Sequence, residues 1–367
     1  MSAAIRISAL GTAIGITLDD TISPDASLHV AQIWESASID GDLPVEATLS
    51  AGLAPRPSDA SAVTASDVES LAAMLSTRVT LAAIEKRKSE LVMLHACGVA
   101  LPDGGVVAFV GPSGRGKTTL ARNVAQHFSY ITDETVGIDI SGGVHPYRKP
   151  LSVITDETKP HIKTQIPPEQ LGLLPLGSEP LRIAAIVLLE RDAEHEGPPT
   201  AEPVSLRDAI LGVVPELSYL PELPQPLQRL AGLLDQVGGV SRLHYREAAD
   251  VADVVPQLVK QPAQSGWTVV PTVDLDEHVP TGDYARAATL DVLDLGAEYL
   301  FLSGRNVHVL DGIGPAIWDA LDEPKDLSRV TDAVVARHGA PEGAHPEALV
   351  EAALNALSTE GLVRRGS

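Results

Sequence analysis

The most informative stretch of the sequence is GPSGRGKT, residues 111–118, which matches the pattern G-x-x-x-x-G-K-[ST]. Glycines in such a loop allow backbone conformations that turn successive N–H groups toward one point, where they bind phosphate oxygens. Lys117 would reach the β- and γ-phosphates of a nucleotide, and the Thr118 hydroxyl would ligate Mg²⁺. A strand-like run precedes the loop and a helix-like run follows it, as this pattern requires. The predicted nucleotide-binding residues are Gly111, Ser113, Gly114, Arg115, Gly116, Lys117, Thr118 and Thr119.

An acidic pair, Asp133 and Glu134, begins only 16 residues after Lys117. Carboxylates can ligate Mg²⁺, and a carboxylate can take the proton from a hydroxyl that attacks a phosphate. The short strand-like run 129–132 leads directly into the pair. If that strand lies beside the strand 106–110, both carboxylates emerge at the C-terminal edge of the sheet, next to the phosphates. From spacing alone, an ordinary acidic turn is an almost equally good interpretation.

Three further residues are candidates for this site. His95 interrupts the apolar, strand-like run 91–101, where an imidazole is unusual. A single histidine in such a run is more often a buried structural residue, and that alternative stays open. Arg148 and Lys149 carry charges that suit phosphate or peptide contact, although solvated surface positions are the simpler interpretation for each.

The elements around these residues predict an α/β chain with several parts. Residues 89–260 alternate between strand-like and helix-like runs, which is typical of an α/β P-loop domain. Residues 1–88 form a mixed α/β accessory segment, in which AIRISALGTAIGI is strand-like and DVESLAAMLSTRVTLAAIEKR has helical spacing. Residues 261–281 contain a Gln-, Pro-, Ser- and Gly-rich linker, and residues 282–367 form a small separate α+β domain.

The C-terminal domain has the pattern of a winged helix. EYLFLS and NVHVLDG flank the two-residue turn Gly304-Arg305, which predicts a β-hairpin, and three helix-like runs follow. Winged helices often bind DNA. Residues 311–367 contain ten acidic and five basic residues, however, and this net negative charge disfavours contact with a phosphate backbone.

The composition narrows the possible partners. The chain carries 27 Lys and Arg against 49 Asp and Glu, a formal charge of −22 that opposes nucleic-acid binding. Cys97 is the one cysteine, so we expect no intramolecular disulfide and a small buried side chain. No run is long and apolar enough for a membrane span, and the N-terminus lacks the pattern of a signal peptide. We therefore expect a cytoplasmic protein with no membrane partner.

The runs LHACGVAL, GPSGRGKT and SYITDETV resemble the kinase domain of bacterial HPr kinase/phosphorylase and its smaller relatives. The resemblance covers residues 89–160 by motif and extends more loosely to residue 260. It implies that Asp133 is the base toward a serine hydroxyl. It also implies that Glu134 joins Thr118 and Asp133 in holding Mg²⁺.

Lys117 belongs to the predicted catalytic set because it would stabilise charge on the γ-phosphoryl group. The same resemblance adds His95 to this set, with a supporting role. The chain departs from the family pattern at two positions: Glu134 replaces an aspartate, and Ala96 replaces the glycine after the histidine. An Arg-Gly-Leu-Gly-like signature, which accompanies phosphorylase activity in that family, is absent from the sequence. Reversal by inorganic phosphate is therefore not expected.

The run from VHVLDGIGPAIWDALDEP through ALVEAALNALSTEGLV resembles the PqqD-like family, the peptide-recognition elements of pathways that modify ribosomally made peptides. The resemblance covers most of residues 282–365. It implies that a leader peptide adds a strand beside residues 306–310 and lies against the helix 346–360.

Together the resemblances imply an ATP- and Mg²⁺-dependent kinase that phosphorylates a serine or threonine of a precursor peptide. A second hypothesis is an ATP-gated peptide-binding chaperone without kinase activity, and a third, weaker one is a transcriptional regulator with an ATP sensor. The expected partners are a precursor peptide and a further peptide-modifying enzyme. Whether the chain forms a homo-oligomer stays open.

Overall fold

The computed structural model describes residues 3–39, 44–54, 62–112, 114, 116–155, 163–263, 266–270, 279–289, 291–340, 343 and 345–366. Its contacts divide the chain into two compact units, one comprising Met1–Leu223 and Leu233–Ala263, the other Pro224–Gly232 and Gln264–Ser367. Each unit is described by itself. The finer domain boundaries expected from the sequence stay predictions.

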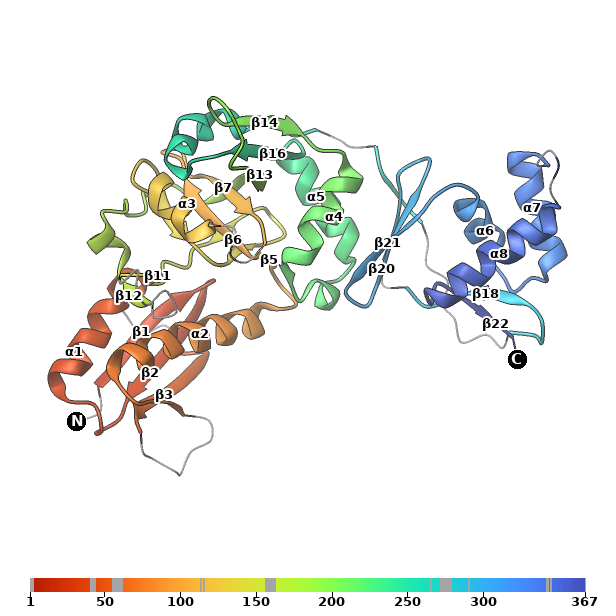
Figure 1. Cartoon of the computed structure of the whole chain (residues 1–367). Coiled ribbons are helices and arrows are strands. Elements are labelled where there is room, and N and C mark those ends of the chain that lie inside the picture. The colour runs from red at the N-terminus through yellow and green to blue at the C-terminus, as the bar shows by residue number, and fades with distance from the viewer. Residues whose placement is uncertain are drawn as a thin grey trace. The chain divides into compact units, whose positions relative to one another are not determined.

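The larger unit begins with a four-stranded sheet and the helices that pack on it (Figure 1). Leu10 (φ +52°) and Gly11 (φ +74°) both adopt left-handed conformations, so the chain reverses there in two residues. The run AIRISALGTAIGI, predicted to be strand-like, is therefore a hairpin of two strands. The elements of this layer are β1 (Ala3–Ala9), β2 (Thr12–Leu18), α1 (Pro24–Ile33), η1 (Glu35–Ala37), β3 (Ala47–Leu53), β4 (Val63–Ala65) and α2 (Val68–Arg87).

Helix α2 follows the helical spacing predicted for it. The Asp67 side chain caps its N-terminus by accepting a hydrogen bond of 2.8 Å from the Ser70 amide. Leu71, Leu75 and Val79 recur at helical spacing and are fully buried against the sheet. The helix thus closes the apolar core of this layer.

A six-stranded mixed sheet forms the centre of the larger unit, in the order β14-β16-β13-β7-β6-β8. The central strand β13 pairs in parallel with β7 and with β16. Strand β6 is antiparallel to both of its neighbours, β7 and β8. The strands are β6 (Ala96–Ala100), β7 (Gly105–Val110), β8 (Ser129–Thr132), β13 (Arg182–Arg191), β14 (Thr200–Pro203) and β16 (Val240–Tyr245).

Two small sheets complete the strands of the larger unit, in the orders β10-β9-β5-β15 and β11-β12. The run 91–101 is therefore not one strand, because its first half pairs in the small sheet and its second half in the central sheet. The strands are β5 (Val92–Leu94), β9 (Val136–Ile138), β10 (Val144–His145), β11 (Leu151–Val153), β12 (Thr164–Ile166) and β15 (Leu217–Ser218).

Helices connect these strands and cover the central sheet. The run Ala248–Leu258 is a 3₁₀-helix that contains Pro256. None of the helices in the described part of the chain combines the length and the apolar character that a membrane span requires. The helices are α3 (Lys117–Val124), η2 (Pro168–Leu171), α4 (Leu206–Val213), η3 (Val214–Glu216), η4 (Leu220–Glu222) and η5 (Ala248–Leu258), together with α5 (Pro226–Gln236), whose residues up to Gly232 belong to the smaller unit.

In its described C-terminal part, from residue 266 on, the smaller unit combines a four-stranded sheet, a strand pair and three helices (Figure 1). Its sheet has the order β17-β19-β20-β21, and Ser303 pairs with Asn306, which confirms the two-residue turn Gly304-Arg305. The elements are β17 (Thr268–Val269), β18 (Tyr284–Arg286), β19 (Asp291–Asp294), β20 (Tyr299–Ser303), β21 (Asn306–Leu310), α6 (Gly314–Ala320), α7 (Leu327–His338), α8 (Pro346–Thr359) and β22 (Val363–Arg365).

Trp318 is the centre of the core of the smaller unit. Its ring lies edge-on to Phe301 of β20, with centroids 4.4 Å apart and planes at 71°. The Arg286 guanidinium stacks 5.1 Å from the centroid of the Trp318 ring and donates to the Trp318 carbonyl at 2.8 Å. The ring therefore joins the sheet, helix α6 and strand β18.

Replacing Trp318 by alanine should destabilise the smaller unit by about 3–5 kcal/mol, because it removes a buried aromatic side chain and leaves a cavity. Hydrogen exchange of the α6–α8 amides in the full chain measures this free energy of opening. Leu349→Ala is the matched control, since Leu349 is 47% exposed on α8 and its loss should change the same free energy by less than about 0.5 kcal/mol. Equal effects of the two substitutions would contradict the assignment of Trp318.

Candidate functional site

The phosphate-binding loop expected from the sequence connects β7 to α3. Gly114 (φ +81°) and Gly116 (φ +89°) adopt left-handed conformations, and Gly116 is the N-cap of α3. An added Cβ at either position would meet no atom within 4 Å, so the backbone conformation and not lack of space selects glycine. Ser113 and Arg115, both predicted to bind nucleotide, lie outside the residues that the structure describes.

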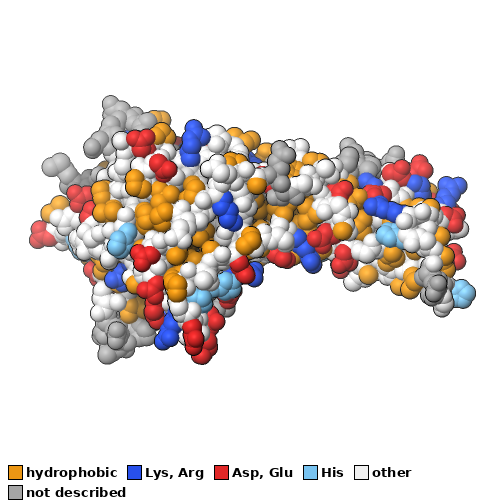
Figure 2. Space-filling model, turned by 90° about the horizontal axis from the view of Figure 1, so that it is seen from above, with side chains coloured by type: hydrophobic (Ala, Val, Ile, Leu, Met, Phe, Trp, Pro, Cys, Tyr) orange, Lys and Arg blue, Asp and Glu red, His pale blue; other side chains and the backbone are white. Residues whose placement is uncertain are grey.

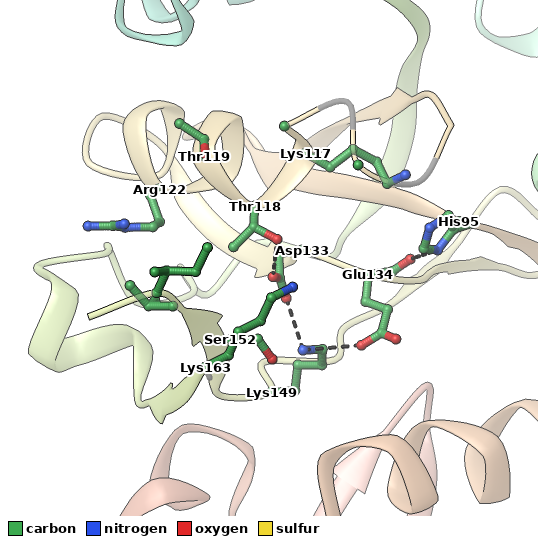
Figure 3. Close-up of a pocket in the computed structure, with 14 residues that line it drawn as sticks. His95, Lys117, Thr118, Thr119, Arg122, Asp133, Glu134, Lys149, Ser152 and Lys163 are labelled. Carbon is green, nitrogen blue, oxygen red and sulfur yellow. Dashed lines mark hydrogen bonds and ion pairs between the residues drawn. The ribbon is translucent and has the colours of Figure 1, made fainter. Parts of the chain in front are cut away.

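Lys117, the first residue of α3, lies along this loop (Figure 3). Its side chain is buried, and Nζ donates to the carbonyl oxygens of Gly111 and, at 3.2 Å, Pro112. Burial lowers the pKa of Lys117, while the nearby carboxylate of Glu216 opposes this shift. The ammonium is thus held at the loop by backbone carbonyls, which a phosphate can replace as its partner.

The acidic pair lies beside the start of α3. The expectation that β8 lies next to β7 is wrong, because β6 separates the two strands. Since β6 is antiparallel to both, β7 and β8 still run in the same direction and end at the same edge. There the Thr118 hydroxyl donates to Asp133 Oδ2 at 2.9 Å. The predicted metal ligands Thr118 and Asp133 are therefore in direct contact.

Asp133 is 6% exposed, and its second oxygen is also engaged. Tyr130 donates its hydroxyl to Asp133 Oδ1 at 3.2 Å. Burial, together with the charge of Asp133, raises the pKa of Tyr130 well above its ordinary value, so the phenol stays protonated and remains a donor. Asp133 is consequently held in one orientation by groups from α3 and β8.

Lys149 connects the two carboxylates. Its Nζ lies 3.2 Å from Asp133 Oδ1 and 3.1 Å from Glu134 Oε2, and its side chain is only 3% exposed. Burial alone would lower the pKa of Lys149, but Asp133 and Glu134 outweigh it and raise this pKa above its ordinary value. The interpretation of Lys149 as a solvated surface charge is wrong.

Arg148 is buried as well, and its contacts are structural. Its guanidinium donates to the carbonyl oxygens of Tyr130 and Leu174 and forms an ion pair of 2.8 Å with Glu169. The guanidinium carbon also lies 5.6 Å from the centroid of the Tyr130 ring. This residue therefore fixes strand β8 and the segment that carries Lys149, and the solvated position favoured from the sequence is wrong.

His95 lies between β5 and β6, at the point where the chain passes from one sheet to the other. Its Nδ1 is 3.1 Å from the carbonyl oxygen of Glu134, and its amide donates to the Glu216 carbonyl at 2.7 Å. The imidazole thus contacts the main chain of the acidic pair at Glu134. The supporting role expected for His95 stays a prediction.

These residues line one cavity of about 490 Å³ (Figure 3). It brings together His95, Lys117, Asp133, Glu134 and the residues at the start of α3, whereas Gly111 contributes through its contact with Lys117. Three polar residues of the lining were not singled out in the sequence, because none of them stands in a recognisable motif. These residues are Arg122, Ser152 and Lys163.

The oxygen atoms at this cavity fit Mg²⁺. The Thr118 hydroxyl and the carboxylates of Asp133 and Glu134 are hard donors, the kind that this ion prefers. Across the described ranges, no group of three or more His, Cys, Asp or Glu residues could hold a metal alone. A magnesium ion here would take its remaining ligands from phosphates and water, as is usual for this metal.

The smaller unit presents a second candidate surface at β21. This strand pairs with β20 on one side and is the last strand of its sheet in the described part of the chain. His308 of β21 lies 3.4 Å from Glu360 at the end of α8, so the strand and the helix border the same region. The sequence assigned peptide binding to the edge of β21 and the face of α8, and this assignment stays a prediction.

Cys97 of β6 is buried as predicted. Burial raises the pKa of its thiol to about 12, with Asp133 adding to the shift. The thiol therefore remains protonated, and it packs in the apolar core beneath the site.

Three comparisons place these features among known proteins. Residues 298–363 match the family model of "Coenzyme PQQ synthesis protein D (PqqD)". Among solved structures, the chain aligns with the Hpr(Ser) kinase/phosphatase from Coxiella burnetii at 12% identity, over 45% of this chain and 92% of that chain, with a TM-score of 0.26. The comparison with curated proteins gave no match.

For the smaller unit the family match is direct, and residues 298–363 form a PqqD domain.

Proposed function

We propose that the larger unit is a P-loop phosphotransferase that moves the γ-phosphoryl group of ATP to a serine or threonine of a precursor peptide. The observation that carries this proposal is the contact between Thr118 and Asp133, because it joins a phosphate-loop hydroxyl to a carboxylate 2.9 Å away. A glycine-rich loop alone would support nucleotide binding only. The adjacent carboxylate supplies a group that can take a proton.

In this mechanism, backbone N–H groups of the loop and Lys117 bind the phosphates. Thr118, Asp133 and Glu134 hold Mg²⁺, which when bound neutralises charge on the phosphate oxygens. The hydroxyl oxygen of the peptide forms a bond to the γ-phosphorus, and the bond between the γ-phosphorus and the β-phosphate oxygen breaks. Asp133 accepts the proton that this hydroxyl loses. His95 acts indirectly, by holding the main chain at Glu134.

The PqqD domain would capture the leader segment of the same peptide through β21. Ser303 and Asn306 flank the two-residue turn, so they exchange both of their backbone hydrogen bonds. Pairs alternate along the hairpin, and His308 therefore also bonds to β20. Val307 and Val309 direct their backbone groups to the open edge. A peptide strand could bond to these groups, which is β-augmentation.

Binding of the leader segment by one unit would assist modification of the acceptor segment by the other. A leader segment held by the PqqD domain would raise the effective concentration of its own acceptor segment to roughly millimolar, if the intervening chain can span the distance. This effect allows a weakly binding acceptor segment to be modified efficiently. It also restricts modification to peptides with the correct leader.

Other macromolecular partners are disfavoured by charge. The chain carries a formal charge of −22, and on the face shown in Figure 2 Lys and Arg side chains are scattered among acidic and apolar ones. Nucleic-acid binding requires a concentrated basic surface. The peptide is therefore the preferred partner in this proposal, over the DNA expected of a transcriptional regulator.

A second candidate function is an ATP-gated peptide chaperone without phosphoryl transfer. It is favoured by the contacts of Asp133, whose two oxygens already accept from Thr118 and Tyr130 and which pairs with Lys149. Incubation of the protein with a precursor peptide and γ-labelled ATP separates the two functions. Label on the peptide supports the kinase, whereas free phosphate alone or no turnover supports the gate.

Replacing Asp133 by asparagine should lower phosphate transfer to the peptide at least about a hundredfold, the usual scale for the loss of a general base. ATP binding, measured by calorimetry, should be retained, because Lys117 and the loop are unchanged. Asp253→Asn is the matched control, since Asp253 is exposed on η5 and is absent from the cavity lining. Transfer by the Asp133 variant at the wild-type rate would rule out the assigned base.

Replacing Val309 by proline should weaken binding of the labelled leader segment at least about tenfold. Proline removes an N–H that points to the open edge and leaves the bonds to β20 intact. Val309→Ala keeps the N–H and controls for the lost side chain, so it should bind much more tightly than the proline variant. Fluorescence anisotropy measures both affinities, and equal weakening by the two substitutions would contradict strand addition at β21.

A further inference from the structure

Lys149 is a buried cation in contact with both carboxylates that are proposed to bind the metal. We propose that its ammonium is an internal counter-ion that occupies the metal-binding carboxylates until nucleotide phosphates arrive, and so makes divalent-cation binding depend on nucleotide. The inference rests on the proposed metal site at Thr118, Asp133 and Glu134. It adds an order of assembly to that site.

The ammonium of Lys149 lies beside the carboxylate oxygens that a bound metal ion would need as ligands. Its Nζ is within 3.2 Å of an oxygen from each carboxylate, 3.2 Å for Asp133 and 3.1 Å for Glu134. The other oxygen of Asp133 accepts from the Thr118 hydroxyl. All three proposed metal ligands are thus engaged with protein groups, as the dashed contacts in Figure 3 show for both carboxylates.

The segment that carries Lys149 is fixed on several sides, so the position of its ammonium is built into the fold. The Tyr147 hydroxyl is buried and lies 2.9 Å from the Thr80 hydroxyl of helix α2. Arg148 is held by the carbonyl oxygens of Tyr130 and Leu174. The Lys149 Nζ itself also donates to the Pro150 carbonyl at 3.1 Å.

Electrostatics explains why this arrangement would delay the metal. A divalent cation that entered alone would have to separate the ammonium from both carboxylates inside a cavity where charge interactions are strong. The displaced ammonium, only 3% exposed, would then lack a partner of opposite charge. Nucleotide phosphates remove this obstacle, because their oxygens can ligate the metal and accept hydrogen bonds from the ammonium.

The remaining groups of the cavity support this assignment. Lys117 is bound to the loop carbonyls and does not contact the acidic pair. Arg122 lies on the opposite side of the cavity from Glu134 and His95 (Figure 3). Lys163 also lines the cavity, but among the described residues Lys149 is the cation that forms ion pairs with both carboxylates. Lys149 is therefore the cation placed to compete with a metal for both of them.

The test is Mn²⁺ binding to the full chain, measured by electron paramagnetic resonance with and without a non-hydrolysable ATP analogue and corrected for Mn²⁺ held by free analogue. In the wild-type protein the analogue should tighten Mn²⁺ binding at least about tenfold. Lys149→Met should bind Mn²⁺ at least about tenfold more tightly than wild type without the analogue, because both carboxylates lose their competing charge. The gain caused by the analogue should shrink correspondingly.

Two further variants serve as controls. Lys149→Arg keeps the charge and should retain the dependence on the analogue. Arg122→Met removes one positive charge from the same cavity, away from the carboxylates, and should leave Mn²⁺ binding without analogue at the wild-type level. A gain in the Arg122 variant equal to that in Lys149→Met would show a general charge effect and overturn the proposal.

The proposal is also overturned if Mn²⁺ binds the wild-type protein equally well with and without the analogue, a result that needs no variant to fold. An unchanged affinity in a folded Lys149→Met variant has the same meaning. These outcomes are distinct from failure of the proposed function. If γ-labelled ATP never labels a peptide but Mn²⁺ binding follows the predicted pattern, the kinase proposal fails while the role of Lys149 stands.

Discussion

The hydrogen bond between Thr118 and Asp133 is the contact on which the candidate site depends. It joins the first turn of α3, the helix that follows β7, to the residue after β8, and β6 separates these two strands in the central sheet. Because β6 is antiparallel to both neighbours, the ends of β7 and β8 meet at one edge. A glycine loop, a buried lysine and an acidic pair thereby come together within one cavity.

Charge is distributed unevenly in this molecule. The chain as a whole is strongly acidic, yet Lys117, Arg148 and Lys149 are all buried in the larger unit. A buried cation is tolerated only when it is paired or hydrogen-bonded. Lys117 satisfies this requirement with carbonyl oxygens and Lys149 with two carboxylates. An anionic ligand can replace such partners, and this makes the cavity suited to phosphate.

The smaller unit uses a different physical principle. The surface proposed for peptide binding is the edge of a sheet, where backbone groups of β21 would be available to another strand. The core behind this edge is centred on Trp318 and Phe301, which hold the sheet against helix α6. Backbone bonding would give affinity with little sequence restriction, and the neighbouring face of α8 would supply selectivity. In the proposed function, the PqqD domain captures the peptide and the larger unit modifies it.

Sequence alone determined the features that depend on local backbone geometry. The glycines of the phosphate loop, the Asp67 cap of α2 and the two-residue turn of the β20-β21 hairpin each follow from residues close together in the chain. The PqqD resemblance was also present in the sequence and is matched by residues 298–363. These features required no knowledge of how distant segments pair.

Tertiary structure decided the rest of the site. The place of β6 between β7 and β8, the break at His95 and the burial of Lys149 all depend on pairing between segments far apart in sequence. The apolar run 91–101 does not by itself show that its two halves belong to different sheets. The adjacent charges of Arg148 and Lys149 likewise do not show which residues they contact. Such positions are determined by which strands pair. The free energy that favours this pairing is distributed over the whole core, and no single sequence motif specifies it.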